Sequence, residues 1–172
     1  MKLLFRVVML VLALILPAAA QQQEQSQSAT ANFIDREGKD VGRAALTVAE
    51  GGVLIDLQVS GLPANRWVAF HVHETGNCDR ASKFETAGKH FNPGNKEHGL
   101  LAADGPHGGD MPNQYVNEDG ILRAQVFDTM VTLDEKDNGI RGRALIIHAN
   151  SDDYRSQPAG DSGDRLACAV IE

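Results

Sequence analysis

The chain has 172 residues, a length typical of one domain, and it carries 16 Lys and Arg against 23 Asp and Glu residues. Its formal net charge of −7 would become −9 if an N-terminal segment containing Lys2 and Arg6 were removed. An acidic balance of this size argues against nucleic acid and anionic membrane surfaces as partners.

The first 20 residues have the layout of a secretory signal peptide. A short basic start is followed by an apolar run over residues 7–16 and by small residues up to Ala20. A membrane-spanning helix needs about 20 apolar residues, so an uncleaved anchor is the less favoured alternative. We therefore expect cleavage after Ala20, export to a bacterial periplasm or else secretion, and no stable membrane insertion afterwards.

The rest of the chain divides into a polar leader and one β-rich domain. Residues 21–31 are rich in Gln and Ser and are typical of a flexible leader, which leaves residues 32–172 as the domain. Apolar and polar residues alternate between turn signals, a pattern that predicts strands. The predicted strands are residues 31–35, 42–48, 53–59, 66–73, 121–128, 130–133, 143–148 and 165–171. With no helical stripe of ten residues, this pattern predicts an all-β sandwich or barrel.

Residues 74–113 interrupt the strands with about forty residues that contain three histidines and Cys78. Loops longer than roughly 12–15 residues are rare inside compact domains unless they are functional or disordered. Metal coordination and a disulfide are two usual ways to order such a loop. The second cysteine, Cys168, makes one disulfide the expected outcome in an exported chain, with free thiols or an intermolecular bridge as alternatives.

The six histidines cluster with one aspartate in a pattern that suggests metal binding. His71 and His73 lie two apart on a predicted strand, so both side chains leave the same face. Three histidines and an aspartate suit zinc or a similar borderline ion, and glycines around them let the backbone turn tightly. The remaining candidates are His90, His98, His107 and Asp110 in the long loop, and His148 at the end of an apolar strand. Scattered surface histidines are the alternative.

At these residues the sequence closely resembles the copper–zinc superoxide dismutases. The matching segments are FHVHETGNC at 70–78, TAGKHFNP at 86–93, KEHG at 96–99, GPHGGDMPN at 105–113, GRALIIHANSDD at 142–153 and GDRLACAVI at 163–171. They run in the order that this family has. The resemblance implies an eight-stranded antiparallel Greek-key β-barrel, an immunoglobulin-like sandwich with long metal-binding and electrostatic loops, and an active site outside the barrel.

The resemblance also implies one copper and one zinc ion per subunit and assigns a role to each site residue. Copper would be held by His71, His73, His90 and His148, and zinc by His90, His98, His107 and Asp110. Asp152 matches the carboxylate that ties His71 to His98. Cys78 and Cys168 match the intrasubunit disulfide, and Arg165 matches the arginine beside the copper.

The implied activity is that of an oxidoreductase acting on superoxide. Two superoxide radicals and two protons would become dioxygen and hydrogen peroxide through alternate reduction and oxidation of copper, with zinc structural and His90 delivering a proton. The main alternative is a non-catalytic copper-binding or chaperone-like relative, which should lack a copper ligand or the arginine. A plain secreted β domain with accidental histidines is the other.

Departures from the family pattern leave the detail of substrate steering and the charge beside His90 open, and the oligomeric state is a separate question. Lys89 stands beside His90, and Asn150 and Ser151 replace charged residues that many relatives carry. Trp67, the only tryptophan, either anchors a homodimer contact or packs under a loop.

Overall fold

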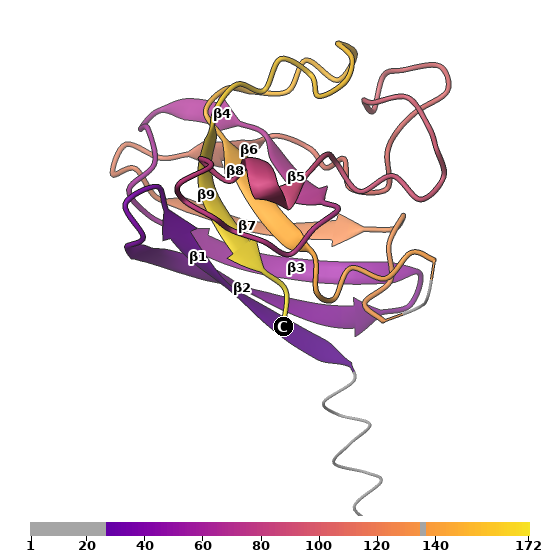
Figure 1. The fold of residues 1–172 in the computed structure, drawn as a ribbon, viewed down its shortest axis with the longest axis horizontal. Coiled ribbons are helices and arrows are strands. Elements are labelled where there is room, and N and C mark those ends of the chain that lie inside the picture. Colours follow the sequence, from indigo (N-terminus) through magenta and orange to yellow (C-terminus); the bar gives the residue numbers. More distant parts are fainter. Residues whose placement is uncertain (1–26, 135–136) are drawn as a thin grey trace, which may run out of the picture.

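A computed structural model describes residues 27–134 and 137–172, so the expected signal peptide lies outside the described part. These residues form one antiparallel sheet of nine strands that nearly closes into a barrel, as Figure 1 shows. The strands are β1 (Ser28–Asp35), β2 (Asp40–Ala49), β3 (Gly52–Val59), β4 (Arg66–Val68), β5 (Phe70–His73), β6 (Gln114–Val116), β7 (Leu122–Asp128), β8 (Ala144–His148) and β9 (Arg165–Val170). One short 3₁₀ helix, η1 (Glu85–Ala87), lies in the long loop.

The strand order explains why the sheet curls back on itself. Neighbouring strands follow the order β4-β6-β7-β3-β2-β1-β9-β8-β5, so β4 and β5 are the two ends of the sheet. Because Ala69 alone separates these two strands in the chain, the sheet's ends must lie side by side. After β3 the chain forms β4 and β5 at the two ends of the sheet and then returns through residues 74–113 to β6 and β7. The last strand, β9, pairs with both β8 and β1, which confirms the predicted all-β barrel.

Three strand predictions differ from the structure, and together they turn eight expected strands into nine. Residues 66–73 form two strands, because Ala69 donates its N–H to Asn150 O just after β8 and accepts the N–H of His148 at the end of β8. Residues 130–133 are not a strand, because Asp128 Oδ1 accepts the Met130 N–H and turns the chain. The short strand β6 was not predicted.

The leader is also shorter than expected. β1 begins at Ser28 and pairs with β2 from Ser28↔Thr47 onward, so residues 28–31 belong to the sheet rather than to a flexible segment. Within the described ranges, no helix is both long enough and apolar enough to cross a membrane.

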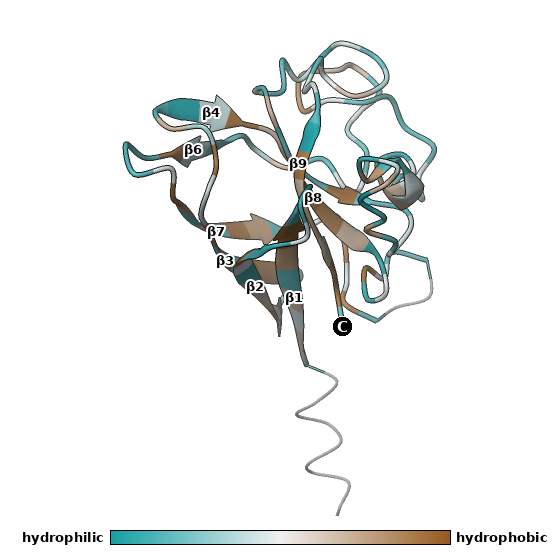
Figure 2. Cartoon of the chain, turned by 60° about the vertical axis from the view of Figure 1, so that its left-hand side comes forward, coloured by the Kyte–Doolittle hydropathy of each residue, from teal (hydrophilic) through white to brown (hydrophobic). Residues whose placement is uncertain are grey.

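The core fills the barrel interior, and the apolar colouring of the strands in Figure 2 follows it. In β3, Val53, Ile55, Leu57 and Val59 are buried, whereas the residues between them are partly or fully exposed. In β5 and β8 every residue is buried, because the inner face packs on the core and the outer face lies beneath the loops. Polar side chains on that outer face are therefore enclosed.

Asp128 places a carboxyl group in the protein interior at the end of β7. Its residue is 3 % exposed, and while Oδ1 accepts the Met130 N–H at 2.9 Å, Oδ2 has no hydrogen-bond partner among the described residues. Burial raises the pKa of this carboxyl to about 6, against the lowering effect of the Met130 hydrogen bond. The folded chain therefore prefers the neutral form of Asp128.

This burial predicts a pH-dependent loss of stability. Because the pKa of Asp128 is higher in the folded than in the unfolded chain, its contribution is complete below pH 3.8 and is lost as pH rises to about 6. Between pH 4 and pH 7 the wild type should lose roughly 3 kcal/mol of unfolding free energy through Asp128. We expect Asp128→Asn not to show this loss. Urea denaturation across this range measures the effect, with the turn residue substitution Asp119→Asn as control. Parallel pH profiles for Asp128→Asn and wild type would contradict it.

Candidate metal centre

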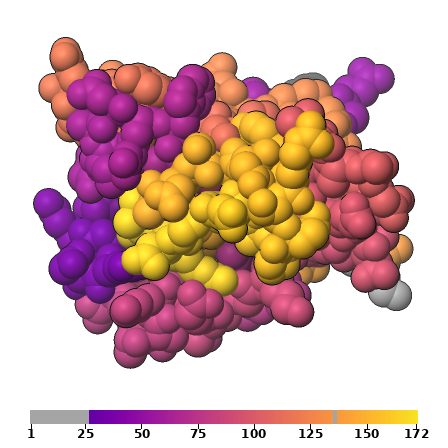
Figure 3. Space-filling view, turned by 90° about the horizontal axis from the view of Figure 1, so that it is seen from above, coloured from indigo at the N-terminus to yellow at the C-terminus, as the bar shows by residue number. Residues whose placement is uncertain are grey.

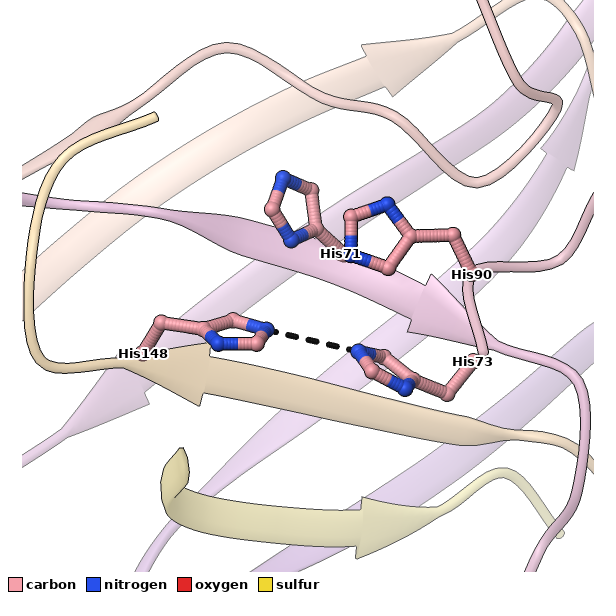
Figure 4. Close-up of side chains that lie close together, drawn as sticks. All are labelled: His71, His73, His90 and His148. Carbon is pink, nitrogen blue, oxygen red and sulfur yellow. Dashed lines mark hydrogen bonds between the residues drawn. The ribbon is translucent and has the colours of Figure 1, made fainter. Parts of the chain in front are cut away.

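The site begins on the outer face of the β5–β8 pair. β5 is paired with β8 in the register Phe70↔Ile147 to His73↔Ala144, and Phe70 belongs to the core cluster. His71 and His73 therefore leave the opposite face together, as their spacing predicts. His148 ends β8 at a register shift, and its Nε2 lies 3.3 Å from His73 Nε2. Figure 4 marks this contact between the two rings with a dashed line.

The long loop lies along β5 and brings its own histidines to the same face. Val72 donates its N–H to Gly109 O at 2.9 Å and accepts the Phe91 N–H at 2.8 Å, so two loop segments pair with one strand residue. This approach requires glycine at 109, because a Cβ atom there would lie 2.3 Å from Val72 O. The pairing places His90 beside His73.

The second loop, residues 149–164, completes the enclosure from above. Figure 3 shows this yellow-orange segment packed between parts of the long loop, which are coloured magenta to salmon. Tyr154 O accepts the Leu101 N–H at 3.2 Å, and Asn113 exchanges hydrogen bonds with the backbone of Asp152 at 2.8 Å. All six histidines and Asp110 are buried as a result.

The structure brings these buried side chains into two groups that share His90. Within each group, one potential ligand atom per residue lies within 4.8 Å of every other. The first group is His71, His73, His90 and His148, and the second is His90, His98, His107 and Asp110. These are the two sets of residues that the family resemblance implies.

The first group fits a copper ion. His71 Nδ1 and His90 Nε2 are buried without a hydrogen-bond partner in the described part of the chain, and His73 Nε2 and His148 Nε2 face each other. Buried ring nitrogens without partners are unusual in folded proteins and call for an explanation such as a bound ion. Four imidazole nitrogens are a donor set that suits copper.

The second group fits a tetrahedral zinc ion. Asp110 Oδ1 lies 2.8 Å from His90 Nδ1, 3.1 Å from His98 Nδ1 and 3.4 Å from His107 Nδ1. Zinc holds tetrahedral ligands at about 2.0–2.1 Å, which sets neighbouring ligand atoms roughly 3.3 Å apart. Spacing and donor type therefore agree with zinc.

The protonation of the histidines differs between the two groups. Burial, reinforced by neighbouring histidines, lowers the pKa of His73 and His148 well below the usual value and that of His90 to about 4. These rings are neutral near pH 7, which is the form that binds metal. Burial also acts to lower the pKa of His98, but hydrogen bonds to Asp110 and Asp152 outweigh it and raise the value to about 9. Metal binding at His98 should therefore release a proton.

Asp152 links the two groups through one buried carboxylate. Its Oδ2 lies 2.9 Å from His71 Nε2, and its Oδ1 lies 3.0 Å from His98 Nε2. These contacts leave the Nδ1 atom of each ring free to face its own metal group. Gly160 is required here, because a Cβ atom would fall 1.8 Å from Asp152 Oδ1.

Comparison with known proteins places this architecture in a family. The family model for copper/zinc superoxide dismutase (SODC) matches residues 40–171. A copper–zinc superoxide dismutase of Aquifex aeolicus is 48% identical over 147 residues, covering 83% of this chain and 85% of the relative. The chain belongs to the copper/zinc superoxide dismutase family.

Further members and solved structures agree with this assignment. A copper–zinc superoxide dismutase of Caulobacter vibrioides is 39% identical, covering 84% of this chain and 86% of the relative. The Cu/Zn superoxide dismutase structure from Brucella abortus aligns with a TM-score of 0.70 and 31% identity, covering 84% of this chain and 99% of that one. A SOD-like protein from Bacillus subtilis aligns with a TM-score of 0.79 and 34% identity, covering 83% and 97%.

In this family member, Arg165 lies at the start of β9 beside the first histidine group. Its Nη1 donates to Phe84 O at 2.6 Å and its Nη2 to Gly88 O at 2.8 Å. It lines a cavity of about 280 Å³ together with His73, His90 and His148.

The charged partner of Arg165 differs from the local candidates in the sequence. Asp161 and Asp164 are the acidic residues closest to Arg165 in the sequence, but Asp164 pairs with Arg36 at 3.1 Å. Arg165 Nη2 instead lies 3.3 Å from Glu85 Oε2. Sequence reasoning missed Glu85, which lies eighty residues from Arg165 with only its place in the long loop as a signal.

The two cysteines of the superoxide dismutase domain form one disulfide. Cys78 and Cys168 are bonded with their Cα atoms 5.7 Å apart, and neither cysteine is free. Cys168 packs with Phe84 and Ala87, so the bond fixes the long loop against β9 close to the carbonyl groups that hold Arg165. This confirms the expected pairing and removes the free-thiol and intermolecular alternatives.

Loss of this bond should lower stability and loosen the loop together. A crosslink that closes a loop of this length contributes roughly 2–5 kcal/mol, so we expect Cys78→Ser to lower the unfolding free energy by that amount. Metal content should also fall, because the loop carries three of the histidines. Denaturation and metal analysis measure both effects, and the double variant Cys78→Ser/Cys168→Ser controls for the new free thiol. Unchanged stability in both variants would contradict the prediction.

Proposed function

We propose that this chain is a superoxide dismutase that converts two superoxide radicals and two protons into dioxygen and hydrogen peroxide. The observation that carries the proposal is the pair of buried donor groups sharing His90, with Arg165 in the cavity that opens onto them. Membership of the copper/zinc superoxide dismutase family supports the same reaction.

Each chain would hold one copper and one zinc ion. The residues for copper are His71, His73, His90 and His148, and those for zinc are His90, His98, His107 and Asp110. Bound copper supplies the alternate one-electron oxidation and reduction of superoxide, whereas zinc has no accessible redox change and is structural. Asp152 orients His71 and His98 for these two sites through its two carboxylate oxygens.

His90 and Arg165 are the residues that would act on the substrate. The Nδ1 atom of His90 faces Asp110, while its Nε2 atom faces the first group, and the ring lines the cavity. A proton held at Nε2 would lie where reduced superoxide needs one. The guanidinium of Arg165 stays charged at working pH and offers donors to a small anion in the same cavity.

A superoxide-decay assay tests the function directly. We expect rapid decay with protein loaded with copper and zinc, little decay with zinc alone, and close to one ion of each metal per chain. A His148→Ala variant, which removes one member of the first group, should lose the copper-dependent activity. Tight copper binding without superoxide decay would instead support the non-catalytic copper-binding or chaperone-like alternative, which the presence of all four histidines and Arg165 disfavours.

We also propose that residues 1–20 are removed and that the mature protein works in the periplasm or outside the cell. The disulfide supports this location, because such bonds persist mainly in oxidising compartments. The mass of the exported protein tests it, since cleavage after Ala20 predicts a chain beginning at Gln21.

A homodimer is the assembly that the surface favours. Trp67 is 57% exposed, which contradicts packing under a loop, and Tyr115 beside it is 47% exposed. Their ring centroids lie 5.3 Å apart in an edge-to-face arrangement, with Trp67 on β4 and Tyr115 on the paired strand β6. Exposed aromatic groups of this kind are enriched in protein interfaces. Sedimentation equilibrium should give a dimer for the wild type and a larger monomer fraction for Trp67→Ser, and a monomeric wild type would refute the proposal.

A further inference from the structure

The cavity at Arg165 carries balanced charges. Its lining includes two cationic side chains, Lys89 and Arg165, and two acidic ones, Glu85 and Asp161. An enzyme with an anionic substrate gains nothing from acidic groups at its entrance, because they repel the substrate. The two acids need a different explanation.

Glu85 is the acidic residue in direct contact with the guanidinium of Arg165, which would bind the substrate. Its Oε2 lies 3.3 Å from Arg165 Nη2, and its side chain is 70% exposed, whereas that of Arg165 is 13% exposed. The guanidinium is already held by the carbonyls of Phe84 and Gly88, at 2.6 Å and 2.8 Å. Charge-assisted hydrogen bonds of this kind fix position strongly, so Glu85 contributes charge at Nη2 more than it contributes geometry.

We propose that Glu85 sets the valence selectivity of the anion site at Arg165, holding off divalent anions more strongly than the monovalent substrate. Any anion that approaches Nη2 also approaches the Glu85 carboxylate. The repulsion energy is proportional to the charge of the anion, so the factor by which Glu85 lowers occupancy for a divalent anion is the square of that for a monovalent one.

This selectivity deepens the proposed function and rests on it. Abundant divalent anions such as sulfate or hydrogen phosphate would otherwise occupy the cationic site and block superoxide. At a separation of about 5 Å in a water-like, salt-screened setting, one carboxylate lowers the occupancy of a monovalent anion roughly two- to fourfold. The corresponding factor for a divalent anion is roughly four- to sixteenfold.

The test compares Glu85→Gln with wild-type protein loaded with copper and zinc, at constant ionic strength. The readouts are the second-order rate with superoxide, the inhibition constants of azide and of sulfate, and sulfate binding by calorimetry. The variant should react roughly two- to fourfold faster with superoxide and bind azide roughly two- to fourfold more tightly. Its affinity for sulfate should rise roughly four- to sixteenfold. Glu118→Gln is the matched control, since it removes the same charge from the β6–β7 turn, outside the cavity lining.

Three results would overturn the assignment. If Glu85 mainly holds Arg165 in place, Glu85→Gln reacts more slowly and binds both anions more weakly. Equal gains for azide and sulfate would remove the valence effect, and equal gains in Glu118→Gln would show a global charge effect. Failure of the proposed function is distinguishable, because a wild type without superoxide decay still reports sulfate affinity in the calorimeter.

Discussion

Replacing Asp110 with Ala should lower the unfolding free energy by roughly 3 kcal/mol and remove most of the zinc from the protein. Asp110 Oδ2 accepts the N–H groups of Gly99 at 2.8 Å and His107 at 3.0 Å. Its Oδ1 faces the Nδ1 atoms of three buried histidines. The substitution therefore leaves buried donors without partners and deletes the only anionic zinc ligand. For a domain of this size the expected fall in Tm is about 6–12 °C.

Melting curves with and without zinc separate the two consequences. A ligand that binds only the folded chain raises its stability according to its concentration and affinity, so zinc should raise the Tm of the wild type strongly and that of Asp110→Ala little. Asp104→Ala is a suitable control, because Asp104 lies in the same loop but forms an exposed ion pair with Lys96. Exposed pairs contribute about 0–1 kcal/mol. An equal zinc-induced shift in Asp110→Ala and wild type would remove Asp110 from the zinc site.

The histidine groups could be predicted because strand periodicity and backbone pairing act locally. Two-residue spacing puts His71 and His73 on one face wherever a strand forms, and β5 is a strand. The glycine-rich composition around the loop histidines indicates close backbone approach, and Gly109 against Val72 O is such an approach. Family resemblance adds the division into two groups, which spacing alone does not give.

Contacts between distant segments could not be predicted from the same patterns. Glu85 reaches Arg165 because the disulfide and two carbonyl hydrogen bonds fix the long loop against β9, and no periodicity records that. Asp164, which precedes Arg165 in the sequence, instead forms an ion pair with Arg36, a residue more than a hundred positions earlier in the chain. β6 has only three residues, too few for an alternating pattern to show.

Removal of Arg165 should have the largest effect on the rate of any surface charge in this chain. The net charge, −7 for the full chain and −9 without Lys2 and Arg6, repels superoxide over long distances, so the local potential at the cavity must be reversed by the metals and by cationic side chains. We expect Arg165→Ala to lower the second-order rate about tenfold or more with its metal content unchanged. The rate of the wild type should fall as salt rises, because attraction is screened over about 8–10 Å, and the variant should depend less on salt.

Two further variants distinguish the charge of Arg165 from its position. Arg123→Ala removes the same charge from the exposed face of β7 and should keep nearly the wild-type rate and salt dependence. Arg165→Lys keeps the charge, but an ammonium group lacks the planar fork that reaches the Phe84 and Gly88 carbonyls together. It should therefore retain the salt dependence while reacting at an intermediate rate. If Arg165→Ala matches the wild type in rate and in salt dependence, Arg165 does not guide the substrate, and the other cationic residue of the cavity, Lys89, would have to do so.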